Sequence, residues 1–229
     1  MNRKLKVDFH THTGDDPQDY IDFSSVELLD RAADDGFDAV AITNHHIITF
    51  SPTLEKYAAE RGILLLPGVE LTLSGRHVLV INPDPGTDLG IRSLGDLARI
   101  RSDRKLIIAP HPFYPGFKCL RSRLEEYISS FDAVEFSSFY NHLINRNKGA
   151  VRAAEEHGLP LVGSSDCHNI WQAGSTYSLV EADKTIPSII AAVKSGKVEV
   201  ATTPLSSATM MRVMANWILG DRLKIHWRI

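Results

Sequence analysis

Two clusters of histidine and carboxylate residues lie near opposite ends of the 229-residue chain. One is Asp8-Phe9-His10-Thr11-His12, and the other is Ser165-Asp166-Cys167-His168. On a strand, two histidines separated by one residue share a face, about 6.5 to 7 Å apart along the chain, so their neutral nitrogens can bind one cation. Either pair alone is equally compatible with hydrogen-bonded structural residues.

Further candidates lie between these clusters, each at the edge of a short apolar run: His45, Glu70, His77 and His111. Side chains at the ends of adjacent strands can meet although they are far apart in sequence. Mixed nitrogen and carboxylate ligands suit zinc, manganese or iron, and suit calcium poorly. The pattern therefore predicts a site for two or three divalent transition metals. For His77, a histidine packed in the core is the alternative.

The elements that must position these residues alternate along the chain. Apolar and polar residues alternate over residues 4–9, which predicts a strand, and Ser24 with Glu27 forms a capping box that begins a helix. Further strands are expected at 38–43, 63–69, 77–81, 106–109, 133–136 and 161–165, and further helices at 52–61, 94–101, 124–129, 145–157 and 187–194. This alternation predicts an α/β architecture with a parallel sheet. Candidate ligands at the ends of most strands favour a barrel over a doubly wound sheet, which would gather them near one switch point.

Composition narrows the class of protein. Hydrophobic residues make up 43% and charged residues 23%, which is typical of a soluble globular domain. The formal net charge of −3 argues against nucleic acid as a partner, although a local basic groove is compatible with it. Neither a signal peptide nor an apolar run of roughly 18 residues is visible, so we predict a cytoplasmic protein without a membrane partner.

The motifs resemble those of the PHP superfamily, which is named for polymerase and histidinol phosphatase. The matching segments appear in the family's order, at residues 8–12, 43–45, 68–70, 109–112 and 165–168. The resemblance implies a distorted, TIM-like (β/α)7 barrel, which we expect over residues 1–203. Residues 204–229 match no known pattern. A helical stripe from Met210 to Ile218 and alternation from Leu223 to Ile229 predict a short helix–strand extension that packs on the barrel or mediates oligomerisation. We expect a monomer or a small homo-oligomer.

The resemblance also implies three ligand sets. The first metal would take His10, His12, Glu70 and Asp166. A second would share Glu70 as a bridge and add His77 and His111. A third would take His45, His168 and one residue of the loop after His12, where the family pattern is replaced by Gly14-Asp15-Asp16-Pro17-Gln18. Among Asp15, Asp16 and Asp19, we choose Asp16.

Three polar residues are expected behind these ligands. Asp8 precedes the first pair, and Asn44 stands where the family usually has aspartate, from where it can orient His45 through a hydrogen bond. Glu135 ends a predicted strand. It either supports a ligand histidine or forms a buried pair with Arg146.

The resemblance implies a metal-dependent phosphoesterase that hydrolyses a small phosphomonoester or a nucleotide with a metal-activated hydroxide. Asp166 or His168 would supply the catalytic proton. Cations near the mouth of the barrel would bind the phosphate: Lys118, Arg121, Arg123 and Arg146. The alternatives are an amidohydrolase-type enzyme acting on a C–N bond and a non-catalytic metal-binding module.

Overall fold

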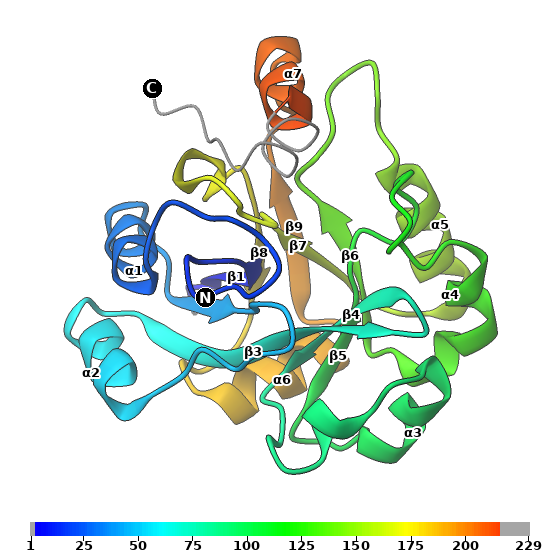
Figure 1. Cartoon of the computed structure of the whole chain (residues 1–229), viewed down its shortest axis with the longest axis horizontal. Helices are drawn as coiled ribbons and strands as arrows, with labels where there is room; N and C mark the ends of the chain where they lie inside the picture. Colours follow the sequence, from blue (N-terminus) through cyan, green and yellow to red (C-terminus); the bar gives the residue numbers. More distant parts are fainter. Residues whose placement is uncertain (1–2, 216–229) are drawn as a thin grey trace.

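A single curled sheet organises the protein. The computed structural model describes residues 3–215, and in this range nine strands pair in the order β7-β6-β5-β4-β3-β2-β1-β8-β9 (Figure 1). The strands are β1 (Leu5–Thr11), β2 (Ala39–Ile42), β3 (Leu64–Leu73), β4 (Arg76–Ile81), β5 (Leu106–Ala109), β6 (Ala133–Ser137), β7 (Leu161–Ser164), β8 (Thr176–Val180) and β9 (Val198–Thr202).

Helices connect the strands and surround the sheet (Figure 1). They are α1 (Ser25–Asp34), α2 (Pro52–Glu60), α3 (Leu97–Ile100), α4 (Ser122–Tyr127), α5 (Asn147–His157), α6 (Ile186–Lys194) and α7 (Ser207–Ala215). Short 3₁₀ helices lie at η1 (Asp88–Gly90), η2 (Leu94–Asp96), η3 (Ile128–Ser130) and η4 (Ile170–Gln172). The predicted capping box is confirmed, because the Ser24 hydroxyl accepts from the Glu27 N–H while the Glu27 carboxylate accepts from the Ser24 N–H. In the described part of the chain, no helix has the length and apolar character needed to cross a membrane.

Strand β4 runs in the opposite direction to its neighbours, so its start lies at the end of the sheet where the parallel strands finish. The strands β1 to β3 are mutually parallel, as are β5 to β7, whereas β4 is antiparallel to both of its neighbours. The start of β4 therefore lies beside the C-terminal ends of the parallel strands. We call this end of the sheet the mouth.

Three apolar clusters show which face of the sheet is interior. Val7, Ala39, Ala41 and Ile108 pack inside, with side chains of α6 closing the base. Neighbouring residues of opposite parity, such as Val40 and Ile42, pack outward against α1 and α2. A third cluster joins the outer face of β3 to β6 with α3, α4 and α5. Inward-facing residues at the mouth therefore converge on one region.

The barrel closes where β1 lies beside β7, although these two strands are not paired in the sheet. Beyond the end of β7, the Asp166 N–H donates to the His10 carbonyl at 2.9 Å and the His12 N–H donates to the Cys167 carbonyl at 3.1 Å. Lower on the same strand, a Cβ at Gly163 would lie 2.5 Å from the Tyr177 carbonyl oxygen, so only glycine allows β7 to approach β8 this closely. The contact between β1 and residues 164–167, which these two backbone hydrogen bonds form, is called the seam.

The predicted mixed α/β, barrel-like fold is confirmed, with two differences in detail. Strand β8 and its antiparallel pairing with β9 were not predicted, and β4 and β8 run against the parallel direction. The predicted C-terminal helix is present as α7. The predicted strand 223–229 lies outside the described residues, as do Trp217 and Ile218. The division into domains at residue 203 stays a prediction.

Candidate metal centre

An irregularity in β1 aims the first histidine pair into the barrel. Val7 pairs with Ala39 and Asp8 with Val40, but Thr11 pairs with Ile42, so β1 carries one extra residue between Asp8 and Thr11. Strict alternation would place His10 on the face opposite Phe9, which belongs to the interior cluster. The extra residue reverses this phase, as β-bulges do beside active sites. His10 and His12 therefore point inward with Phe9.

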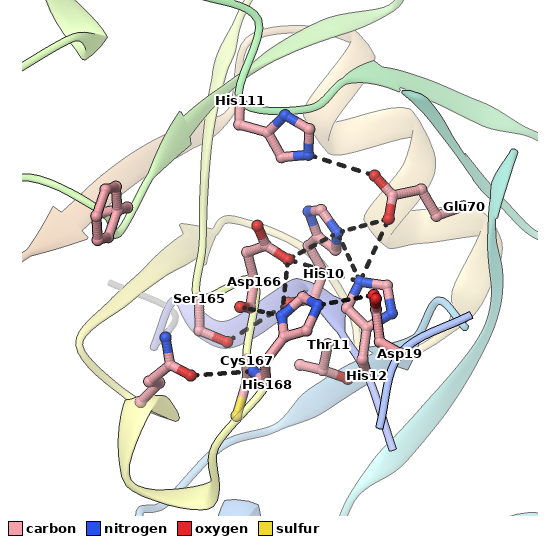
Figure 2. A network of polar contacts seen from close by, with 12 residues as sticks. His10, Thr11, His12, Asp19, Glu70, His111, Ser165, Asp166, Cys167 and His168 are labelled. Atoms are coloured by element: carbon pink, nitrogen blue, oxygen red, sulfur yellow. Dashed lines mark hydrogen bonds and ion pairs between the residues drawn. The ribbon is translucent and has the colours of Figure 1, made fainter. Parts of the chain in front are cut away.

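The two imidazoles face each other through their Nε2 atoms, which are 3.0 Å apart. Their Nδ1 atoms each lie 2.9 Å from a carboxylate oxygen, that of Glu135 for His10 and that of Asp16 for His12. Because a carboxylate accepts the Nδ1–H, each ring directs its Nε2 lone pair toward the common centre. Figure 2 shows Glu70 and Asp166 pointing to the same centre.

Glu70 connects this centre with a second one. Its Oε2 lies 3.5 Å from His10 Nε2 and 3.3 Å from His12 Nε2. Its Oε1 lies 2.7 Å from His77 Nδ1 and 3.3 Å from His111 Nε2. Glu70 is 1% exposed, so this carboxylate can interact only with what the cluster itself binds. The two oxygens thus face two different groups of imidazoles.

A third group lies at the more open side of the cluster. Asp19 Oδ2 lies 3.1 Å from His168 Nε2 and 3.4 Å from His45 Nδ1. Asp166 Oδ1 lies 3.5 Å from His168 Nδ1. Together with the first two groups, these contacts bring every ligand predicted from the sequence to the mouth. Groups of three ligand atoms, all within 4.8 Å of one another, include His10–His12–Glu70 and His45–Glu70–His77.

Within the acidic loop, Asp16 and Asp19 differ in their surroundings. The Oδ2 atom of Asp16 accepts from the His45 N–H at 2.8 Å and contacts the Nδ1 atoms of His12 and His45. Its Oδ1 atom accepts from two backbone N–H groups, those of Gln18 and Asp19. Both oxygens are thus used in ordering the site. Asp19, a candidate to which Asp16 was preferred, presents a more accessible carboxylate to the third group.

Burial and opposite charges inside the cluster shift the pKa values of its members. Burial alone would raise the pKa of Glu70 and of Asp166, but nearby imidazoles, His77 and His10 foremost, hold both pKa values well below their usual range. Burial opposes protonation of His10, yet Asp166 and Glu135 raise its pKa well above the usual value. At His77 burial outweighs Glu70 and lowers the pKa to about 4. The carboxylates are therefore ionised near neutral pH.

Glu135 and Asp8, two of the residues expected to support the ligands, make different contacts. Glu135 holds His10 through one oxygen, and its other oxygen accepts from the His111 N–H at 2.6 Å. The alternative pairing with Arg146 is wrong. Asp8 accepts from the N–H groups of His10 and Ser165, which joins β1 to the seam.

Asn44 stabilises loops and leaves the orientation of His45 to Asp16. Its amide oxygen accepts from the Thr13 N–H, and its amide nitrogen donates to the hydroxyls of Thr13 and Thr49. The expectation that Asn44 hydrogen-bonds to His45 is therefore wrong. Asp16 supplies the carboxylate at His45 Nδ1.

The predicted phosphate-binding cations are largely engaged by the protein. Lys118 donates to the Gln18 side chain, Arg121 donates to the carbonyls of Tyr114 and Pro115, and Arg123 pairs with Glu126. Arg146 is exposed at the start of α5. None of these contacts identifies a phosphate site, so the role of these four residues stays a prediction.

Cys119 supports His111 in a way that the sequence did not predict. Its Sγ atom lies 3.4 Å from His111 Nδ1, and the thiol is buried. His111 adopts a left-handed backbone conformation (φ 30°) that few non-glycine residues accept. A sulfur acceptor at Nδ1–H leaves the Nε2 lone pair directed at Glu70.

Replacing Cys119 with alanine is therefore expected to weaken metal binding by about 10-fold or more, since loss of a supporting partner typically costs this much. Serine retains an acceptor and should restore most of the affinity. Competition with a chromogenic chelator measures both variants. Equal affinities for wild type, alanine and serine variants would show that Cys119 only fills space.

Comparisons with known proteins agree with this geometry. A family profile described as PHP-associated matches residues 145–198. An uncharacterized protein of Methanocaldococcus jannaschii is 28% identical over 145 residues, which are 60% of this chain and 84% of that protein.

Two solved structures show the same fold. One is a two-domain protein of Bacteroides vulgatus containing a predicted PHP-like metal-dependent phosphoesterase, with 19% identity and a TM-score of 0.68 over 91% of this chain and 68% of that chain. The other is PsfC of Pseudomonas syringae, with 22% identity and a TM-score of 0.66 over 98% of this chain and 100% of that chain. The profile matches one segment of the chain and the two solved structures share its fold, which agrees with the resemblance of the five motifs to the PHP superfamily.

Proposed function

We propose that this protein is a metal-dependent phosphoesterase that hydrolyses a small phosphomonoester or a nucleotide. The observation that carries the proposal is the pair of Nε2 atoms facing each other at 3.0 Å, with both Nδ1 atoms held by carboxylates. Two Nε2 atoms this close, beside two ionised carboxylates, need a proton or a cation between them, and the surrounding nitrogen and carboxylate donors suit a metal cation.

The donor set fits divalent transition metals. Nitrogen and carboxylate oxygen in this proportion suit zinc, manganese or iron. The buried Nε2 atom of His77 has no hydrogen-bond partner among the described residues. We assign His10, His12, Glu70 and Asp166 to one ion, and Glu70, His77 and His111 to another. A third would be held by His45 and His168, with Asp16 as first chosen or Asp19, another of the three loop candidates, as the third ligand.

When bound, such cations lower the pKa of a coordinated water and stabilise charge on a phosphoryl oxygen. The protein supplies the orientation of the ligands through Glu135 and Asp16. The side chains of His168 (34% exposed) and Asp166 (27% exposed) are among the more accessible members of the cluster. We therefore retain them as the candidates that protonate the leaving oxygen.

The test uses purified protein loaded separately with zinc, manganese or iron and assayed with 4-nitrophenyl phosphate and bis(4-nitrophenyl) phosphate. We expect hydrolysis of the monoester, loss of activity on chelation and recovery on adding metal. A panel of amides tests the amidohydrolase alternative. Metal-loaded protein that hydrolyses neither ester would overturn the proposal, and a folded, metal-loaded but inert protein would favour the non-catalytic module.

Metal binding is expected to be pH-dependent. Because carboxylates raise the pKa of His10 and of His12 despite the opposing effect of burial, a cation must displace protons there. Affinity should therefore rise as pH rises from about 6 to about 8, with release of protons. Calorimetric titration in two buffers of different ionisation enthalpy measures this release. An affinity that is constant over this range would contradict the assignment of His10 and His12.

A further inference from the structure

The C-terminal helix α7 belongs to the wall of the mouth. Strand β9 runs parallel to β1, since both are antiparallel to β8, so β9 also ends at the mouth. The Thr203 N–H donates to the Ser175 carbonyl, and the Leu205 N–H donates to the Tyr140 carbonyl. The chain leading into α7 is thus fixed between the segments that follow β6 and η4, and α7 rises beside them (Figure 1).

Helix α7 places at this wall a cation that has no ion-pair partner among residues 3–215. The guanidinium carbon of Arg212 lies 4.8 Å from the centre of the Trp171 ring. Its Nε–H is buried and has no hydrogen-bond partner in the structure of residues 3–215, which also offers it no carboxylate. Lys118, Arg121 and Arg123 all have polar partners at this end of the molecule. Stacking on an aromatic ring holds a guanidinium in place without neutralising its charge.

The stacked pair lies close to the metal centre but outside it. Trp171 follows His168 by three residues, so their Cα atoms are at most about 11 Å apart. The next residue, Gln172, accepts from the His168 N–H at 3.1 Å and thereby joins the two. A group bound at Arg212 would share the mouth with a phosphoester held at the cluster.

We propose that Arg212, stacked on Trp171, binds a second anionic group of the substrate, a phosphate or a carboxylate remote from the ester that is cleaved. The inference rests on the proposed phosphoesterase function. A planar guanidinium can bind either anion through two parallel hydrogen bonds. Loss of such contacts is expected to raise KM about 10- to 100-fold for substrates that carry the second group, and to leave kcat nearly unchanged because the contact is remote from the reacting atoms.

The experiment compares three classes of substrate in the metal-loaded protein. 4-Nitrophenyl phosphate carries no second anion, a 5′-phosphorylated trinucleotide carries further phosphates, and a phosphotyrosyl dipeptide carries a carboxylate. For Arg212→Gln we expect a higher KM with one or both of the last two, and less than about a 2-fold change with 4-nitrophenyl phosphate. Which substrate responds identifies the anion. Arg212→Lys, which keeps the charge but loses the planar fork, should fall between wild type and Gln.

Two controls separate binding from folding. Arg152→Gln removes an exposed arginine on α5 and should match wild type. Trp171→Phe keeps an aromatic platform and should retain more affinity than Trp171→Ala, with circular dichroism and thermal unfolding verifying that each variant folds. An unchanged KM for every substrate, or an equal rise for 4-nitrophenyl phosphate, would overturn the inference while leaving the phosphoesterase proposal standing. A wild type that hydrolyses none of the three would instead refute the phosphoesterase proposal.

Discussion

Glu70→Gln is expected to release at least two metal ions and to reduce kcat/KM by about 1000-fold or more, the order of loss seen when a principal electrostatic group is removed from an active site. Glutamine keeps the size of the side chain but loses the charge and one acceptor oxygen. The carboxylate of Glu70 contacts imidazoles of all three proposed metal groups: His10, His12, His45, His77 and His111. Its buried position leaves no room for solvent to replace the missing charge.

Metal content measured by plasma mass spectrometry, together with the phosphatase assay, checks this expectation. A matched control is Glu125→Gln, which removes a carboxylate that also contacts a histidine, His157, but at the surface. That variant should keep the metal content and activity of wild type. Glu70→Gln with full metal content would show that Glu70 does not bridge two ions.

His10→Ala is expected to remove the metal of the first group and the activity together. His10 supplies an Nε2 atom to the centre and is fully buried, so nothing in the chain can take its place. The substitution also leaves Glu135 Oε1 without its imidazole partner, and a buried carboxylate that loses a partner is destabilising. We therefore expect a lower unfolding temperature in addition to the loss of metal.

The control for this variant is His157→Ala, which removes a partly exposed imidazole on α5 remote from the mouth. Stoichiometry and thermal unfolding are compared for the two. Unchanged metal stoichiometry in His10→Ala would contradict our assignment. Loss of activity with metal retained would indicate that His10 acts on the substrate and does not bind the ion.

The strands, the barrel-like sheet and the convergence of the motifs could be predicted, because alternation and short apolar runs are local properties of the sequence. The aim of His10 could not be predicted in this way. Alternation from Leu5 onward places His10 on the face opposite Phe9. Only the extra residue of β1, in its pairing with β2, turns His10 to the inward face that Phe9 already occupies. A bulge depends on pairing with another strand, so the sequence of β1 alone does not contain it.

The acidic loop shows a similar limit. Asp16 and Asp19 have the same chemistry and are three residues apart, and the sequence offers no reason to prefer either. Their roles differ because two backbone N–H groups and the His45 N–H surround Asp16, whereas Asp19 faces His168. Hydrogen bonds from the backbone are a consequence of the loop's path, which residue types do not reveal.

Strand β8, which pairs antiparallel with β9, was missed for a different reason. Residues 176–180 read Thr-Tyr-Ser-Leu-Val, and Ser178 is buried, so the apolar signal of a strand is interrupted. The hydroxyl of Ser178 accepts from the Gly163 N–H and donates to the Gly163 carbonyl. A serine that appears polar in sequence thus acts as a bridge between β7 and β8.

The seam determines when the metal centre can exist during folding. Asp166 and His10 are joined backbone to backbone across 156 positions of chain, so their contact has a high loop-closure entropy and is expected to form late. During synthesis, residues 164–168 must leave the ribosome before Asp166 and His168 can join the ligands of β1. Tight metal binding would therefore report that the barrel has closed, and intermediates with an open seam would bind metal weakly.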